Sequence, residues 1–263
     1  MRPSNWRRRF LIVLAIAVTL IVFVTTVWKT EIRTAIRDIR YSPSTPLPQT
    51  GLDAERFERL HRQILRRKTE GPIDVLFLCD SITEFWQSAA IRSIWDERFA
   101  PLGGANFGVS SDGTQHVLWR ITDGKEIDGL APRVVVLMVG TNNTPTNSAR
   151  AIADGIERIV RTLRLKLPHS RVLLLSILPR ERGGEEIAVK IRAVNQMIAG
   201  LHDGQWITFL DVTASFVDAT GQPARERLSD GLHLSLNGYQ TLADAIAPKL
   251  AELLHEPQLE VKR

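Results

Sequence analysis

Three residues with the chemistry of a nucleophilic hydrolase stand at two distant points of the chain. Ser81 follows the apolar run 73–78 and precedes a helical pattern, so its hydroxyl is expected at a sheet edge beside the first amides of a helix. Asp230 precedes His233 by three residues, a spacing that lets a carboxylate hold an imidazole within one turn. Taken singly, Ser81 is explained as a helix cap and His233 as a loop histidine with satisfied nitrogens. Together they supply a nucleophile, a base and a group that orients the base.

Hydrogen-bond donors suited to an anionic intermediate follow the next two apolar runs. Gly108 stands near the end of the run 105–109, and Asn142 follows the run 134–139 after a glycine. Both residue types are common in turns because they tolerate left-handed backbone, which is the simpler interpretation of each position. A backbone N–H and a side-chain amide are also the groups that stabilise the oxyanion formed when a serine attacks an ester.

The elements that must position these residues alternate between short apolar runs and longer amphipathic stretches. Runs rich in Val, Ile and Leu are typical of parallel strands, and strand–helix alternation predicts an open α/β sheet covered by helices on both sides. Such sheets bind ligands at the carboxyl ends of their strands, where the candidate residues are found. The expected strands are 73–78, 105–109, 134–139, 172–177 and 207–210, and the expected helices are 53–68, 82–98, 115–123, 149–167, 185–201 and 238–254.

The chain of 263 residues carries a formal net charge of +5, but the excess is confined to its first 40 residues. That segment holds eight basic and two acidic residues, whereas the rest holds 26 basic and 27 acidic ones. A nucleic-acid-binding domain carries its positive charge as a patch on the folded part, so nucleic acid is not expected as a partner. The single cysteine, Cys79, excludes a disulfide framework and a zinc site built of thiolates.

The stretch 10–28 contains no charged residue and would span roughly 28 Å as a helix, close to the thickness of the hydrocarbon core of a membrane. It lacks the small-residue cleavage site of a secretory signal peptide, which favours an uncleaved signal anchor. Arg7, Arg8 and Arg9 favour a cytoplasmic amino end, so the rest of the chain is expected outside the cytoplasmic membrane, in the periplasm of a Gram-negative cell. The expected organisation is a basic N-terminus (1–9), a transmembrane anchor (10–28), a juxtamembrane segment with a proline-rich linker (29–50), one α/β domain (51–256) and a C-terminal tail (257–263).

Four segments of this domain resemble, in the same order, the motifs of the SGNH (GDSL-type) hydrolases. They read LFLCDSITEFW, NFGVSSDGTQHVLWRI, VVVLMVGTNN and DGLHLSLNGY. The string QHVLWR at 115–120 makes the chain most similar to the branch of the platelet-activating-factor acetylhydrolase catalytic subunits and their bacterial relatives. The resemblance covers 74–250 and implies a flavodoxin-like three-layer α/β/α sandwich with a mostly parallel sheet of about five strands.

The resemblance implies a role for each candidate residue. Ser81 would be the nucleophile, His233 the general base, and Asp230 the carboxylate that orients His233. The backbone amides of Ser81 and Gly108 and the side-chain amide of Asn142 would form the oxyanion hole. No metal and no organic cofactor is implied.

Two positions depart from the family pattern. Cys79 stands where the family usually has a glycine before the Asp-Ser pair, and Ser111 replaces a second glycine in the next motif. Cys79 could displace Ser81 slightly, because glycine packs closely and adopts backbone angles that other residues avoid. The simpler interpretation of Cys79 is a small, buried and inert side chain.

We therefore expect a membrane-anchored serine esterase that cleaves small carboxylic esters, acetyl esters among them, in an envelope polysaccharide or a lipid. Three alternatives stay open. One is a catalytically silent domain that binds acylated glycan or lipid, and another is a thioesterase or acyltransferase that uses the same residues. The third is a flavodoxin-like electron carrier, for which the sequence offers no phosphate-binding loop. The resembled acetylhydrolase subunits pair as dimers, so a homodimer is one expected state.

Overall fold

A parallel sheet of five strands forms the centre of the molecule. The computed structural model describes residues 6–40 and 42–259. The strands lie in the order β2-β1-β3-β4-β5, which is the order of flavodoxin-like folds, and every neighbouring pair is parallel. The expected α/β fold with a five-stranded parallel sheet is confirmed. The strands are β1 (Val75–Cys79), β2 (Gly104–Gly108), β3 (Val134–Met138), β4 (Arg171–Leu175) and β5 (Ile207–Leu210).

The register of the three neighbouring strands β2, β1 and β3 aligns their carboxyl ends. Cys79 at the end of β1 lies beside Gly108 on one side and Met138 on the other. All residues of β1 and β3 are buried, which explains their uniformly apolar sequences VLFLC and VVVLM. The residues that follow these strands therefore emerge next to one another at a single edge of the sheet.

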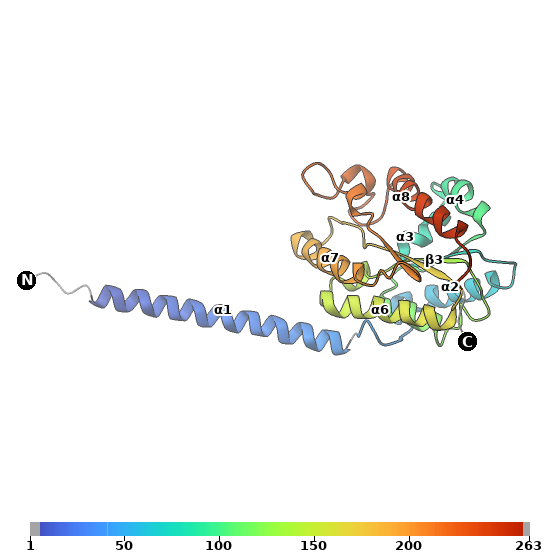
Figure 1. Ribbon diagram of the computed structural model, residues 1–263. Coiled ribbons are helices and arrows are strands. Elements are labelled where there is room, and N and C mark those ends of the chain that lie inside the picture. The colour runs from blue at the N-terminus through green and yellow to red at the C-terminus, as the bar shows by residue number, and fades with distance from the viewer. Residues whose placement is uncertain (1–5, 41, 260–263) are drawn as a thin grey trace, which may run out of the picture.

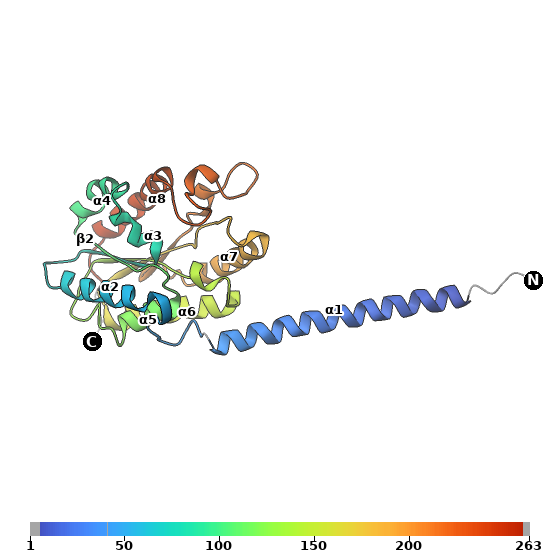
Figure 2. The same ribbon diagram turned by 180° about the vertical axis from the view of Figure 1, so that it is seen from behind.

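Two hydrophobic cores lie on opposite faces of the sheet (Figures 1 and 2). One core packs α2, α5, α6 and α7 against the sheet, and the other packs α3, α4 and α8. The molecule thus has the three layers expected of this fold. The helices of the domain are α2 (Ala54–Arg67), α3 (Ser81–Glu84), α4 (Arg92–Arg98), α5 (Thr114–Ile121), α6 (Ala149–Lys166), α7 (Gly184–Ala199) and α8 (Leu236–His255). Short 3₁₀ turns cover Gly51–Asp53, Phe85–Gln87, Ala100–Leu102, Thr141–Asn143, Thr213–Phe216 and Arg225–Arg227.

The single helix expected over 82–98 is wrong, because this stretch divides into α3, a 3₁₀ turn and α4. Ser88 ends the turn in extended backbone, and its hydroxyl donates to the carbonyl of Phe85 at 2.8 Å. Such a local side-chain bond competes with helical pairing. The break turns the side chain of Trp86 into the core, where it is 1% exposed.

Helix α1 (Trp6–Arg40) projects away from the domain in both views (Figures 1 and 2). After its apolar stretch it continues through charged positions that include Lys29, Glu31 and Arg33. Among the described residues, no helix has the length together with the apolar character that crossing a membrane requires. The transmembrane helix expected at 10–28 is therefore not supported. Residues 1–5 of the expected basic N-terminus and 260–263 of the expected tail lie outside the described residues.

Residues 42–49, here called the N-terminal strap, lie against the domain and do not hang free as a linker. The Thr114 hydroxyl donates to the carbonyl of Pro43 at 2.7 Å. The backbone N–H of Leu47 donates to the carbonyl of Gln115 at 3.1 Å. The side chain of Gln49 is inserted into the domain, and the residue is only 7% exposed.

Candidate active site

Ser81 lies where β1 turns into α3, at the carboxyl edge of the sheet. The carboxylate of Asp80 accepts the backbone N–H of Ile82 at 3.0 Å and so caps the helix. Because Asp80 supplies the cap, the hydroxyl of Ser81 is left for another partner. Burial raises the pKa of Asp80 to about 6, against the lowering effect of the bond from Ile82.

The structure brings Ser81 together with Asp230 and His233, although Ser81 and His233 are 152 residues apart in the sequence. His233 Nε2 lies 3.0 Å from Ser81 Oγ. His233 Nδ1 lies 2.9 Å from Asp230 Oδ2. A hydroxyl, an imidazole and a carboxylate in this relay have the geometry of an activated serine nucleophile.

The loop that carries Asp230 and His233 is shaped by its own hydrogen bonds. Asp230 Oδ1 accepts the backbone N–H groups of Leu232 and His233 at 3.0 and 2.8 Å. Gly231 between them has a φ of +79°, which favours glycine. Burial alone would raise the pKa of Asp230, but the N–H and the side chain of His233 and the N–H of Leu232 lower it to about 2. The carboxylate therefore stays ionised at neutral pH.

Arg182 is a further partner of this loop that the sequence analysis did not identify. Its Nη2 donates to Asp230 Oδ2 at 2.9 Å, and its Nε donates to the Asp230 carbonyl at 3.0 Å. The backbone N–H groups of Glu181 and Arg182 both donate to the carbonyl of Gly231. The loop before α7 thus holds Asp230 in position through Glu181 and Arg182, and no spacing pattern in the sequence signals this contact.

The two further donors expected for an oxyanion lie at the same edge, and both are bonded within the protein. The backbone N–H of Gly108 donates to Asn106 Oδ1 at 2.9 Å. Asn142 Nδ2 donates to the carbonyl of Asp112 at 3.0 Å, and its amide carries a second N–H. A side chain at Gly108 would collide with the backbone of Thr83, 2.7 Å from the carbonyl carbon, so glycine is required for β2 to approach the turn that bears Ser81.

The two departures from the family glycines differ in their consequences. Cys79 lies in β1 with ordinary extended backbone, and its thiol donates to the carbonyl of Met138. Burial, first of several causes, holds the pKa of the Cys79 thiol well above its usual value, as expected of an inert thiol. Ser111 adopts a φ of +67°, a left-handed conformation that favours glycine. Of the two substitutions, only Ser111 introduces backbone strain.

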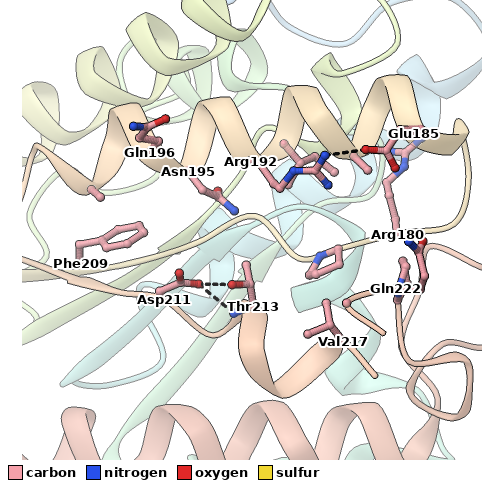
Figure 3. Close-up of a pocket in the computed structure, with 16 residues that line it drawn as sticks. Arg180, Glu185, Arg192, Asn195, Gln196, Phe209, Asp211, Thr213, Val217 and Gln222 are labelled. Carbon is pink, nitrogen blue, oxygen red and sulfur yellow. Dashed lines mark hydrogen bonds and ion pairs between the residues drawn. The ribbon is translucent and has the colours of Figure 1, made fainter. Parts of the chain in front are cut away.

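A cavity of about 350 Å³ lies beside this edge, between α7, β5 and the 213–223 segment (Figure 3). Ser81, Asp230 and His233 do not line it. Arg180 connects the two regions, because it lines the cavity and its Nη1 donates to the carbonyl and the hydroxyl of Thr141 at 3.1 Å. Across the part of the chain that the structure describes, no three His, Cys, Asp or Glu side chains are grouped so that they could hold a metal ion.

Comparisons with known proteins bear on the family and the fold of the chain. The model of the GDSL-like Lipase/Acylhydrolase family matches residues 77–241. The chain is 35% identical to the human platelet-activating factor acetylhydrolase IB subunit alpha1 over 218 residues, which are 82% of this chain and 92% of that protein. It is 35% identical to the rat subunit alpha2 over 197 residues, which are 74% of this chain and 83% of that protein.

A solved structure supports the fold. A GDSL-like lipase from Bacteroides thetaiotaomicron superimposes with a TM-score of 0.62 at 19% identity, over 73% of this chain and 97% of that one. At that identity the likeness bears on the fold alone. The family model and the curated relatives carry the assignment: this chain belongs to the GDSL-like lipase/acylhydrolase family.

Proposed function

We propose that the protein is a serine esterase that hydrolyses small carboxylic esters with Ser81, His233 and Asp230. The observation that carries the proposal is the continuous pair of short contacts from Ser81 Oγ through the His233 ring to Asp230 Oδ2, at 3.0 and 2.9 Å. Family membership makes an acylhydrolase the expected class of enzyme.

The reaction follows from this arrangement. Ser81 Oγ attacks the ester carbonyl carbon while its proton passes to His233 Nε2, and Asp230 stabilises the imidazolium. The negative oxygen of the tetrahedral intermediate accepts hydrogen bonds from the amides of Ser81, Gly108 and Asn142, for which Gly108 must exchange its present bond to Asn106. His233 then gives its proton to the leaving alcohol. Water, deprotonated by His233, attacks the acyl-enzyme and releases the acid.

The acyl group is proposed to be small, with acetyl as the first choice. The support comes from the relatives named platelet-activating factor acetylhydrolase, at 35% identity. We propose an acetylated envelope polysaccharide or lipid as the class of substrate, with no cofactor and no nucleic acid involved. The homodimer stays a prediction, which size-exclusion chromatography with light scattering tests.

The esterase proposal is tested with the full chain and p-nitrophenyl esters of increasing acyl length. Wild type is expected to hydrolyse the acetate faster than the octanoate, and Ser81→Ala is expected to be inactive. Ser93→Ala is the matched control, because Ser93 is an exposed serine of α4 outside the proposed catalytic contacts. Equal rates for wild type and Ser81→Ala would refute the mechanism.

The cellular location is a separate prediction. It depends on the basic residues Arg7, Arg8 and Arg9 beside the uncharged stretch 10–28, and the structure does not support a membrane-spanning helix there. Cell fractionation combined with external protease decides it. Digestion of the domain in intact spheroplasts would support an extracytoplasmic location, whereas protection from the protease would contradict it.

A further inference from the structure

The N-terminal strap reaches the loop between β2 and α5 through one buried side chain. Gln49 Nε2 donates to the carbonyl of Ser110 at 2.9 Å and to Asp112 Oδ1 at 2.6 Å. Gln49 lies outside the stretch 77–241 that matches the family model, so it is no part of the family motifs. It is nevertheless bonded to the loop that follows Gly108.

Asp112 connects this contact to the expected oxyanion donor. Its Oδ2 accepts from Arg120 Nη1 at 2.7 Å, and its backbone carbonyl accepts from Asn142 Nδ2 at 3.0 Å. A second bond of opposite direction joins the same two segments, since the backbone N–H of Thr114 donates to Asn143 Oδ1 at 2.9 Å. The position of the Asn142 amide therefore depends on where Asp112 is held.

Among the described residues, it is the side-chain amide of Gln49 that donates a hydrogen bond to Asp112 Oδ1. Asp112 is 0% exposed, so water does not replace a lost donor there. A buried carboxylate oxygen left without a donor is costly, and the loop is expected to shift to satisfy it. Gln49 thus determines where Asp112 rests.

Backbone strain in the same loop points independently to the need for such a support. Ser111, between the two residues that Gln49 contacts, has a φ of +67°. Residues other than glycine keep this conformation only where their surroundings fix it. The strap supplies two of the fixing bonds, at Ser110 and Asp112.

We propose that Gln49 is a positioning residue, which acts through Asp112 to hold the Asn142 amide where it stabilises the oxyanion. This proposal rests on the proposed esterase function. It makes the N-terminal strap part of the catalytic unit, so a domain that begins at residue 51 would be impaired. Gln49 contacts no reacting atom.

The test is a double-mutant cycle in the full chain with p-nitrophenyl acetate as substrate. Gln49→Met keeps the length of the side chain and removes its donor, and it is expected to lower kcat about 10- to 100-fold with KM nearly unchanged. Asn142→Ala should lower kcat by about 10²- to 10³-fold. Because Gln49 acts through Asn142, adding Gln49→Met to Asn142→Ala should change kcat little further.

The control is Gln205→Met, an exposed glutamine of another loop, which should leave kcat unchanged. Unchanged kcat in Gln49→Met, or full multiplication of the two losses in the double mutant, would overturn the proposal. Thermal unfolding verifies that each variant is folded. If Gln49→Met does not fold, Gln49→Asn replaces it, because it keeps the amide but is too short to reach both acceptors, and the same loss of kcat is expected.

Hydrogen exchange separates failure of this proposal from failure of the esterase function. If wild type hydrolyses no ester, the proposed function fails, and the exchange of the backbone amides at 109–113 then decides the role of Gln49. Faster exchange there in Gln49→Met than in Gln205→Met would support a positioning role. Equal exchange in the two variants would overturn it.

Discussion

Among the described residues, Asp230 with His233 and Asp112 with His116 are two aspartate–histidine pairs whose side chains approach each other, and the two pairs differ in geometry and burial. Asp230 and His233 are three residues apart, and their contact is 2.9 Å long. Asp112 and His116 are four residues apart, and their side chains are 3.9 Å apart. The side chain of Asp230 is 37% exposed, whereas that of Asp112 is 0% exposed.

Electrostatics separates the two pairs further. Burial raises the pKa of Asp230, but the hydrogen bonds that its carboxylate accepts from His233 and Leu232 outweigh burial and hold the pKa at about 2. Burial raises the pKa of Asp112 to about 7, although Arg120 and Gln49 lower it. Burial also lowers the pKa of His116 to about 4, and its Nδ1 accepts the backbone N–H of Gly113 at 2.9 Å.

The comparison shows what a base requires beyond residue type. His233 has a carboxylate beside one nitrogen and a serine hydroxyl beside the other, which is the arrangement that a general base requires. His116 stays neutral and uses its ring as an acceptor that shapes the start of α5. The first pair is suited to proton transfer, whereas the second shapes the loop between β2 and α5.

Replacing each of the two histidines by asparagine should give the largest difference in activity. His233→Asn should lower kcat for p-nitrophenyl acetate by about 10⁴-fold or more, because it removes the base. His116→Asn keeps an acceptor for Gly113 and should stay within about threefold of wild type, since it removes no catalytic group. Steady-state kinetics measures both, and a large loss of kcat in His116→Asn alone would reverse the assignment.

Removal of the two carboxylates should differ most in its effect on stability. Asp112→Ala leaves Arg120 with one fewer buried partner and should lower the free energy of unfolding by about 3–5 kcal/mol. The side chain of Asp230 is partly exposed, so Asp230→Ala should lower the free energy of unfolding by less than about 1 kcal/mol. The same substitution should abolish most of the activity. Urea unfolding monitored by tryptophan fluorescence compares them, and equal destabilisation would contradict this distinction.

The pH dependence of stability should reveal the buried His116. The unfolded chain takes up a proton on this residue below about pH 6.5, whereas the folded state does so only near pH 4. The contribution of His116 is therefore complete above pH 6.5 and is lost as the pH falls toward 4, by up to about 3 kcal/mol. His116→Asn should lack this loss in urea titrations at pH 7 and pH 4.5. Parallel curves for wild type and variant would show that His116 is not buried as a neutral ring.

The smallest effect is expected in the strained loop that carries Asp112. Ser111→Gly should raise the free energy of unfolding by about 0.5–1 kcal/mol, because φ at this position is +67°. Cys79→Gly should instead destabilise, since Cys79 is buried and adopts ordinary extended backbone. Thermal unfolding of the two variants tests the opposite signs.

The sequence allowed the sheet and the residues at its edge to be predicted because both depend on local pattern. Apolar runs marked the strands. Gly108 ends β2, and Ser81 and Asn142 follow β1 and β3, whose ends are in register with it. The Asp230–His233 contact follows from a spacing of three residues. The family resemblance, now confirmed, added the expected roles.

The rest depends on contacts between distant segments, which have no signature in spacing. Arg182 meets Asp230 across 48 residues, and Gln49 meets Asp112 across 63. The break near Ser88 coincides with a side-chain bond to the Phe85 carbonyl, within a pattern that otherwise predicts a helix. The uncharged stretch 10–28 led to a transmembrane helix that the structure does not support.

The central claim is that His233 activates Ser81 as a nucleophile, and covalent labelling tests it most directly. The full chain is treated with a fluorophosphonate, and the adduct is located by mass spectrometry of its peptides. We predict one adduct, on Ser81 in wild type and in His116→Asn, with labelling slowed by orders of magnitude in His233→Asn. Labelling of another serine, or equal labelling of Ser81 with and without His233, would contradict the claim.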